Sequence, residues 1–170
     1  MIVFIVEVFV LCALFTLSCM SQANGLMDHL ERNVVNYPEP IVQRLIEQGK
    51  ISRNRTFTFV ERMKKKWPIM IVFGIFIGIL VRYVNGCVSF VSGFGISYLI
   101  WTIVDWYDAL IIDCVWFCHS KKCIISGTED LVDAYHDYKF HIRRSCLGML
   151  VGLVVCLIAG LVVEVLSYGC

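Results

Sequence analysis

Charged side chains are scarce over most of this 170-residue chain, in which 17% of the residues are Asp, Glu, Lys or Arg. Fourteen of the fifteen Lys and Arg residues lie in two segments, 32–66 and 121–144, and only Arg82 lies outside them. The rest of the sequence lacks the charge of a water-soluble surface. The hydrophobic fraction is 58%, whereas soluble domains typically have about 45–50%. A polytopic membrane protein explains both observations.

Several motifs of soluble enzymes and of nucleic-acid binders are also missing. No Cys-x2-Cys pair occurs, and Gly93-x-Gly95 lacks the strand, the helix and the downstream Lys of a phosphate-binding loop. The net charge is only +1, and the cations flank apolar stretches instead of forming one basic patch. We therefore expect the lipid bilayer, and no nucleic acid, as a partner.

Four apolar stretches approach the roughly 20 residues that a helix needs to cross a bilayer. They are residues 2–20, 68–84, 90–118 and 146–168. The short alternating segments of a membrane β-barrel are absent, and helices satisfy their own backbone polar groups in lipid. The sequence predicts an all-α membrane bundle, one domain over residues 1–170 with about four transmembrane helices.

The two basic segments predict the orientation of these spans. Short loops that are rich in Lys and Arg stay on the cytoplasmic side, which places loops 21–67 and 119–145 in the cytoplasm and both termini outside. The first stretch has no basic N-terminal region and contains Glu7, so we interpret it as a retained span and not as a signal peptide. The predicted location is the cell membrane, as a multi-pass protein.

The first loop contains apolar residues at helical spacing. Ile41, Val42, Leu45 and Ile46 follow Pro40, a typical early helical residue, and precede Gly49, a typical stop; the shared pattern predicts a short amphipathic helix. Such helices either lie on the inner membrane surface or pack on each other as a subdomain. The sequence leaves both arrangements open.

Polar residues within the spans form two predicted sites. The inner site contains Asp105, Asp108, Asp113 and, just beyond the third span, His119. With 3.6 residues per turn the three aspartates cover an arc of about 140°, and no Lys or Arg lies at their depth. Uncompensated carboxylates are typical of a wet cavity, a cation site or proton exchange. Alternatively, Asp108 and Asp113 lie at the membrane–water boundary.

The outer site contains Glu7, Arg82 and Glu164, which lie near the outer ends of three spans. We expect them to meet as a structural ion cluster or to reach the outer interface, with an ion or substrate gate as an alternative.

Two Gly-x3-Gly motifs predict close helix packing, Gly74 with Gly78 and Gly148 with Gly152. They favour a homo-oligomer or a subunit of a membrane complex.

Cysteine and histidine residues raise the question of a metal or thiol site. The candidates are Cys114, Cys118, His119, Cys123, His136 and His141, and Cys118 with His141 and Asp137 is a conceivable nucleophile set. Cys118-x4-Cys123 is not a zinc spacing. We therefore assign no metal, no cofactor and no catalytic residue, and we interpret most cysteines as small apolar residues.

Three segments carry a resemblance to a known family. They are Asp113-Cys-Val-Trp-Phe-Cys-His119-Ser-Lys, Ser126-Gly-Thr-Glu-Asp130 and Tyr135-His-Asp-Tyr-Lys-Phe-His141. Together they resemble a family of small, uncharacterised membrane proteins of Gram-positive bacteria that are loosely described as permease-like. The resemblance implies a bacterial membrane location, and it transfers no catalytic role.

The sequence thus favours a small membrane protein with a transport-related role, or an accessory subunit of a membrane complex. A membrane enzyme is one alternative, centred on Asp105, Asp108, Asp113, His119 and His141 and acting on lipid or another interfacial substrate. A structural or interaction protein is the other, with the basic first loop binding anionic lipid or a cytosolic partner.

Overall fold

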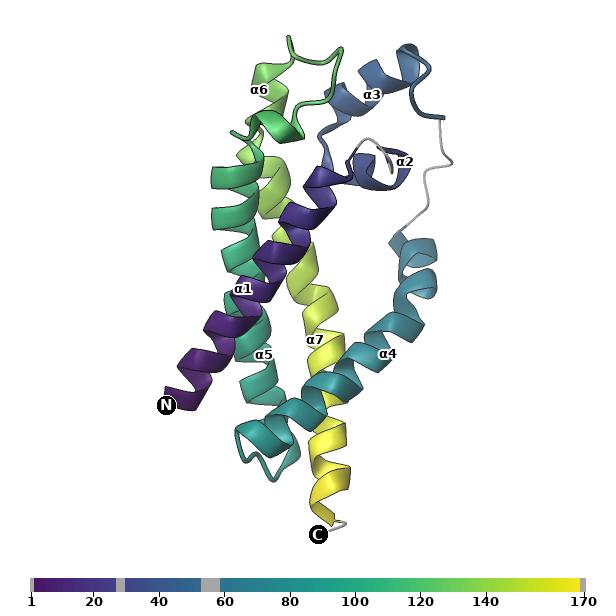
Figure 1. Cartoon of the computed structure of the whole chain (residues 1–170). Helices are drawn as coiled ribbons and strands as arrows, with labels where there is room; N and C mark the ends of the chain where they lie inside the picture. Colours follow the sequence, from purple (N-terminus) through teal and green to yellow (C-terminus); the bar gives the residue numbers. More distant parts are fainter. Residues whose placement is uncertain (1, 27–29, 53–58, 169–170) are drawn as a thin grey trace. The chain divides into compact units, whose positions relative to one another are not determined.

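The structure is a computed structural model that describes residues 2–26, 30–52 and 59–168, without the side chains of residues 32, 59–63 and 65. Every regular element in these ranges is helical (Figure 1). The elements are α1 (Ile2–Asn24), α2 (Leu30–Asn33), η1 (Val34–Asn36), α3 (Glu39–Glu47), α4 (Phe59–Val84), α5 (Phe90–Tyr107), η2 (Asp108–Phe117), η3 (Lys121–Cys123), α6 (Val132–Tyr135) and α7 (Tyr138–Tyr168). The predicted all-α class is confirmed for this part of the chain.

Three helical segments are long and apolar enough to cross a membrane: Ile2–Asn24, Lys66–Val84 and Val132–Tyr168. The predicted third span, residues 90–118, is present as α5 followed by η2, but it is not among these three. Its α-helical part contains Ser, Gly, Tyr and Trp residues together with Asp105, which lower its hydropathy. The composition of the helices therefore supports three spans directly.

Two helices begin earlier than the sequence predicts. Pro68, the first residue of the predicted second span, lies inside α4, which already begins at Phe59. A proline removes one helical hydrogen bond, and the surrounding turns of a long apolar helix tolerate that loss. Similarly, α7 begins at Tyr138 and not near Cys146. His141 is therefore a helical residue.

The chain divides into two compact units. Unit 1 contains Met1–Leu11, Thr56–Asp105 and Cys146–Cys170. Within it α7 lies between α4 and α5 (Figure 1). A Cβ atom on Gly74 or Gly78 of α4 would lie 2.8 Å from Cβ of Ile158 or 2.7 Å from Cβ of Val162. The first Gly-x3-Gly motif thus brings α4 against α7, as the sequence predicts for close packing.

A short turn links α4 to α5. Gly86 has a φ of +69°, which suits a glycine after a helix end, and the N–H of Cys87 donates to the carbonyl of Val81 at 3.3 Å. Ser89 then precedes α5, where its hydroxyl accepts a hydrogen bond from the N–H of Ser92 at 3.4 Å. The two ends leave few backbone groups without partners.

Unit 2 contains Cys12–Arg55 and Trp106–Ser145. It has its own core, built from both predicted cytoplasmic loops: Leu26, Val34, Tyr37, Ile41, Leu45, Ile51, Ile125 and Tyr135. The helix predicted around residue 41 is confirmed as α3, with Pro40 in its first turn. Gly49 follows it with a φ of +67°. Of the two arrangements left open by the sequence, the structure has the packed subdomain.

Hydrogen bonds connect the two predicted cytoplasmic loops within unit 2. The hydroxyl of Tyr37 donates to the carbonyl of Cys123 at 2.8 Å, and the amide of Gln48 donates to the carbonyl of Gly127 at 2.7 Å. Between Ser126 and the start of α7 the chain forms only the four-residue helix α6, and the hydroxyl of Thr128 donates to the carbonyl of Ile125. Such side-chain bonds compete with helix formation.

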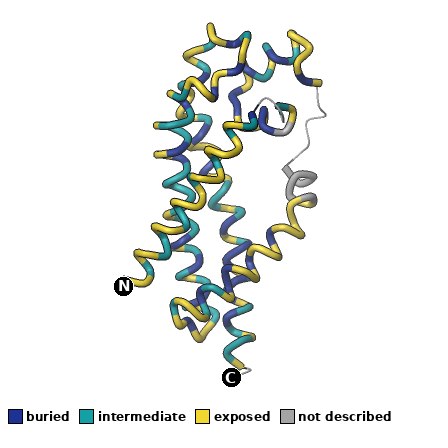
Figure 2. The backbone as a smooth tube through the Cα atoms, viewed as in Figure 1, coloured by how far each residue is buried: buried dark blue, intermediate teal, exposed yellow. Residues whose placement is uncertain are grey.

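The helices α1 and α4 carry many exposed apolar side chains. Figure 2 shows α1 and much of α4 as exposed, and no residue of α1 is buried. Phe9 of α1 is 73% exposed and Ile69 of α4 is also 73% exposed. Many exposed apolar side chains are unfavourable in water and favourable in lipid.

Candidate functional site

The polar residues of the third predicted span lie in an unusual helix. Residues Asp108–Phe117 form the π-helix η2, which continues directly from α5. At its end the N–H of Cys118 donates to the carbonyl of Asp113, five residues earlier, at 3.0 Å. The predicted arc of the three aspartates assumed an α-helix throughout and is therefore wrong beyond Tyr107. Stretches of π-helix are rare and frequently occur at functional sites.

The π-helix presents Asp113 to a histidine on α7. Oδ2 of Asp113 lies 2.9 Å from Nδ1 of His141. The His141 side chain is 2% exposed and that of Asp113 is 29% exposed. The sequence predicted no Lys or Arg at the depth of the aspartates. The partner of Asp113 is instead His141, which the sequence placed only among metal-site and enzyme candidates.

The second nitrogen of His141 is left without a partner. Nε2 is buried and makes no hydrogen bond within the described part of the chain. The ring contacts Phe117, with 5.6 Å between centroids, and Phe140, with 5.2 Å. A carboxylate on Nδ1 fixes the proton there in the neutral ring and leaves a lone pair on Nε2. An unpaired buried polar atom costs about 1–3 kcal/mol, so this arrangement calls for a functional explanation.

The other two aspartates of the predicted inner site are divided between the two units. Asp105 belongs to unit 1 and Asp108 to unit 2, and each has an interaction partner. The predicted inner site of the three aspartates and His119 stays a prediction.

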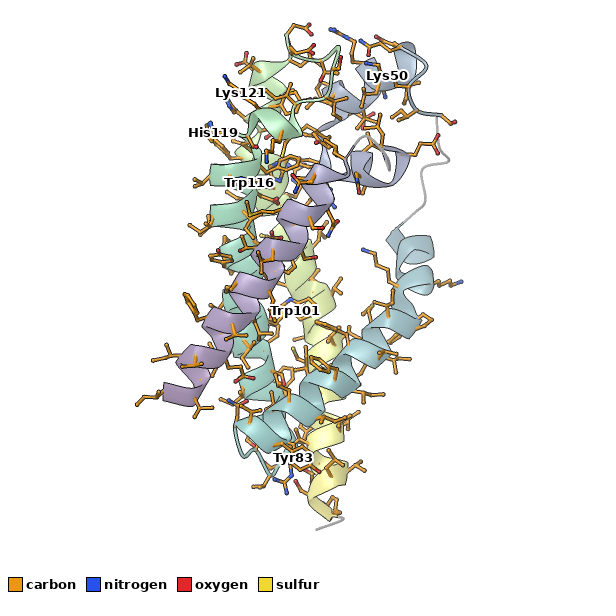
Figure 3. All side chains as sticks on the ribbon, viewed as in Figure 1. Lys50, Tyr83, Trp101, Trp116, His119 and Lys121 are labelled. Carbon is orange, nitrogen blue, oxygen red and sulfur yellow. The ribbon has the colours of Figure 1, made fainter. Side chains whose placement is uncertain are left out.

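His119 has partners of its own at the exposed end of η2. Its Nε2 lies 3.0 Å from the hydroxyl of Tyr138, and its ring centroid lies 4.6 Å from that of His136. Figure 3 shows Trp116, His119 and Lys121 following one another along the end of η2 and the turn after it. An exposed aromatic–basic edge of this kind is typical of a membrane–water interface.

The predicted outer site separates into three independent contacts in unit 1. Oε2 of Glu7 accepts a hydrogen bond from the side-chain amide of Asn85 at 2.8 Å. Oε2 of Glu164 accepts the N–H of Phe90 at 2.5 Å. Arg82 lies over the ring of Tyr83 at 5.9 Å. No ion pair joins the three charged residues; amide donors occupy both carboxylates instead.

The second Gly-x3-Gly motif holds two side chains of α5. A Cβ atom on Gly148 would lie 2.5 Å from Oδ1 of Asp105, and one on Gly152 would lie 2.2 Å from Nε1 of Trp101. The two glycines are four residues apart on α7, and Trp101 and Asp105 are four residues apart on α5. Each glycine therefore faces one of these side chains, one helical turn from the next contact. Both glycine motifs therefore serve contacts within one chain.

Similarity to known proteins gives no further guidance. No protein-family model, curated protein or solved structure matches this chain. The resemblance to permease-like membrane proteins consequently stays a prediction, and any functional assignment depends on the geometry of the chain itself.

The cysteine and histidine residues form no described metal centre. Within residues 2–26, 30–52 and 59–168 no three Cys, His, Asp or Glu side chains are grouped as ligands. The eight cysteines in these ranges are free. Burial raises the pKa of the Cys123 thiol, which disfavours the thiolate that a metal ion or a nucleophilic reaction needs. Cys118, from the predicted nucleophile set, is 3% exposed.

Sequence reasoning missed the pairing of Asp113 with His141. The sequence positions could have predicted this pair. Asp113 lies shortly before the inner end of the predicted third span, and His141 lies shortly before the start of the predicted fourth span. Consecutive antiparallel helices bring such positions to a similar depth. It also missed Asn85 as the partner of Glu7, since an asparagine in a turn is more commonly a turn former.

Proposed function

We propose that this chain is a four-span membrane protein whose spans are α1, α4, α5 with η2, and α7. Both basic loops lie in the cytoplasm and both termini lie outside. The apolar segments of α1, α4 and α7 support the proposal, as do the exposed Phe9 and Ile69. The uninterrupted run of α5 and η2 from Phe90 to Phe117 supports the fourth span.

We further propose a transport-related role, either alone or as a subunit of a membrane complex. The observation that carries this proposal is the partly buried contact between Asp113 and His141. Ionisable residues in membrane segments are costly and typically belong to ion or proton pathways. The membrane enzyme is less favoured, because His119 lies with Tyr138 and His136.

Ion flux through the reconstituted full-length protein tests this role. Liposomes with a pH-sensitive dye inside, and parallel liposomes with dyes for Na⁺ and K⁺, should report flux above that of protein-free liposomes. Asp113→Asn should reduce the flux at least about tenfold, in line with the 10²–10⁴-fold contribution of positioned proton-transfer groups. Asp133→Asn is the matched control on exposed α6 and should leave flux unchanged. Flux equal to protein-free liposomes for all three ions would contradict the transport-related role of the isolated chain.

A structural or interaction protein is the second candidate, and the packed core of unit 2 favours it. A subdomain assembled from two loops presents a defined surface to a partner. Homo-oligomer formation is also a proposal, now without the glycine motifs as its interface. The mass of the protein in lipid nanodiscs, at several protein concentrations, measures the oligomeric state.

A further inference from the structure

We infer that the inner end of α1 is a binding site for an anionic phospholipid, whose phosphate group lies beside Lys122 and whose acyl chain lies along α1. This inference rests on the proposed membrane location and goes beyond the transport-related role, because it names a ligand that transport does not require. Three features of unit 2 carry it: a hollow, a pair of lysines and an exposed apolar face of α1.

The hollow lies where α1 ends and has a volume of about 240 Å³. It is lined by Ala23, Asn24, Leu26 and Lys122, all of which belong to unit 2. The ammonium group of Lys122 and the amide group of Asn24 are hydrogen-bond donors, and lysine is a common ligand of phosphate groups. Ala23 and Leu26 add apolar surface. The lining therefore suits a ligand that joins a phosphate group to an apolar part.

Two neighbouring lysines favour an anionic ligand in the hollow. Lys121 and Lys122 are both exposed, and neither forms an ion pair with another side chain that the structure describes. Lys121, labelled in Figure 3, follows the exposed His119 in the turn after η2. Lysines close to a bilayer surface attract anionic lipids. The pair thus favours a lipid with a net negative charge over a zwitterionic lipid.

Backbone hydrogen bonds reduce the negative charge that the end of α1 presents to an anion. The last carbonyl groups of a helix carry partial negative charge where they lack donors. In α1 the N–H of Gly25 donates to the carbonyl of Ser21 at 3.3 Å, and the N–H of Leu26 donates to the carbonyl of Ala23 at 3.4 Å. Two of these carbonyls therefore have partners, and the Lys122 ammonium contributes a full positive charge to the hollow.

An exposed apolar face of α1 continues from the hollow. No residue of α1 is buried, and Leu17 and Met20 are 64% and 42% exposed. They precede Asn24 by about two turns and about one turn, so all three side chains lie on one side of the helix. An acyl chain that starts at a phosphate in the hollow can follow this face without leaving the hydrocarbon region of the bilayer.

The length of α1 places the hollow at the level of the lipid phosphates. The helix has 23 residues, which at 1.5 Å per residue span roughly 34 Å. The hydrocarbon core of a bilayer is about 30 Å thick. A span that begins at the outer edge of this core near Ile2 therefore ends just beyond its inner edge at Asn24. This depth, together with the apolar face, favours a phospholipid over a free phosphate ion.

Native mass spectrometry of the full-length protein, released from detergent micelles, tests this inference. Phosphatidylglycerol and phosphatidylcholine with the same oleoyl chains are titrated separately. The first phosphatidylglycerol should bind at least about fivefold more tightly than the first phosphatidylcholine, which corresponds to the usual contribution of one lysine near anionic lipid. Sodium phosphate at millimolar concentration, as a competitor, should displace little phosphatidylglycerol, because it lacks the acyl chain.

Variants at the hollow locate the bound lipid. Lys122→Gln should weaken phosphatidylglycerol binding about fivefold and leave phosphatidylcholine binding unchanged. Lys122→Arg keeps the charge and should bind as the wild type does. Lys139→Gln is the matched control, because Lys139 is an exposed lysine of unit 2 that does not line the hollow, and it should also bind as the wild type does.

The outcomes separate the inference from the proposed function. Equal affinity for the two lipids, an affinity that Lys122→Gln does not change, or an equal loss in Lys139→Gln overturns the inference. Full displacement by sodium phosphate also overturns it, because the hollow would then bind phosphate without a lipid chain. A protein that stays in solution without detergent and binds neither lipid contradicts the proposed membrane location as well. Binding that depends on Lys122, without ion flux in liposomes, contradicts only the transport-related role.

Discussion

At the scale of single residues, two buried tyrosines connect the loops of unit 2. Tyr37 is 2% exposed and Tyr135 is 3% exposed, and their rings meet edge to face with 5.9 Å between centroids. The hydroxyl of Tyr135 accepts the N–H of Ile125 at 2.9 Å and lies 2.6 Å from the hydroxyl of Thr128. Burial raises the pKa of Tyr135, so the neutral phenol is the form that this core holds.

Replacing Tyr135 by Phe should destabilise unit 2. The change removes the acceptor of the Ile125 N–H, and a buried donor without a partner costs about 1–3 kcal/mol. Thermal unfolding of the protein in detergent, followed by near-ultraviolet circular dichroism, measures the loss. Tyr138→Phe is the control, because Tyr138 is 40% exposed and water can replace its hydroxyl contact. Equal losses in the two variants would show that the Tyr135 hydroxyl is not buried.

The pair of Arg44 and Asp130 predicts a weak dependence of stability on acid. Hydrogen bonds from Arg44 to Asp130, each 3.1 Å long, hold the pKa of Asp130 below its ordinary value of 3.8. A carboxyl whose pKa is lowered on folding adds stability above its unfolded pKa, and that stability disappears as the pH falls through the folded pKa. The pair is exposed, so the effect is small.

Arg44→Gln should remove this acid-dependent part of the stability. The melting temperature of the variant should fall less than that of the wild type as the pH is lowered from about 5 to 2, which spans the titration of the carboxyl. Arg143→Gln, another exposed arginine of unit 2, should keep the wild-type slope. A slope unchanged by Arg44→Gln would mean that the pair does not persist in solution.

At the scale of helices, glycines set how closely α7 approaches its neighbours in unit 1. A Cβ at Gly74 would lie 2.9 Å from the carbonyl oxygen of Val155, and one at Gly78 would lie 2.8 Å from that of Ala159. Both obstacles are backbone atoms, which cannot rotate away as a flexible side chain would. The contact between α4 and α7 therefore depends on the absence of side chains at these two positions.

Gly74→Ala should destabilise the packing of α4 on α7 by about 1–3 kcal/mol, the usual effect of overpacking. Gly95→Ala is the matched control, because a Cβ there would meet nothing within 4 Å. Since alanine favours helix more than glycine does, the control should be neutral or stabilising. Unfolding in detergent by a mild denaturant such as SDS compares the two variants. A loss in Gly95→Ala as large as in Gly74→Ala would contradict the packing argument.

At the scale of the whole molecule, the distribution of Lys and Arg predicts which loops face the cytoplasm. The exposed positions Ser52, Ser126 and Ser89 sample the two basic loops and the link between α4 and α5. We expect the basic loops to stay inside, because translocating Lys and Arg is unfavourable.

Single cysteines at these positions, in a background without reactive cysteines, should show this orientation. A membrane-impermeant maleimide added to intact cells should label Ser89→Cys. It should label Ser52→Cys and Ser126→Cys only after the membrane is opened. Labelling of Ser52→Cys in intact cells would contradict the proposed topology.

The sequence by itself determined the class of the fold and most helix positions. Apolar length and the lack of charge predict helices where α1, α4, α5 and α7 occur, because a long apolar run has few other stable forms. Local signals also located α3, through Pro40 and Gly49. The end of α3 and the turn at Gly86 depend on residues that are neighbours in the sequence. Local sequence signals are therefore sufficient to predict both.

Only the tertiary structure decided which polar groups meet. Asp113 and His141 are 28 residues apart in the chain. Their contact depends on a π-helix, which the periodicity of apolar residues does not predict. The same holds for Gly148 with Asp105 and for Tyr37 with Cys123. Hydrogen bonds reach only about 3 Å, so a pairing depends on the rotation and depth of each helix. Those are set by the packing of all the helices together.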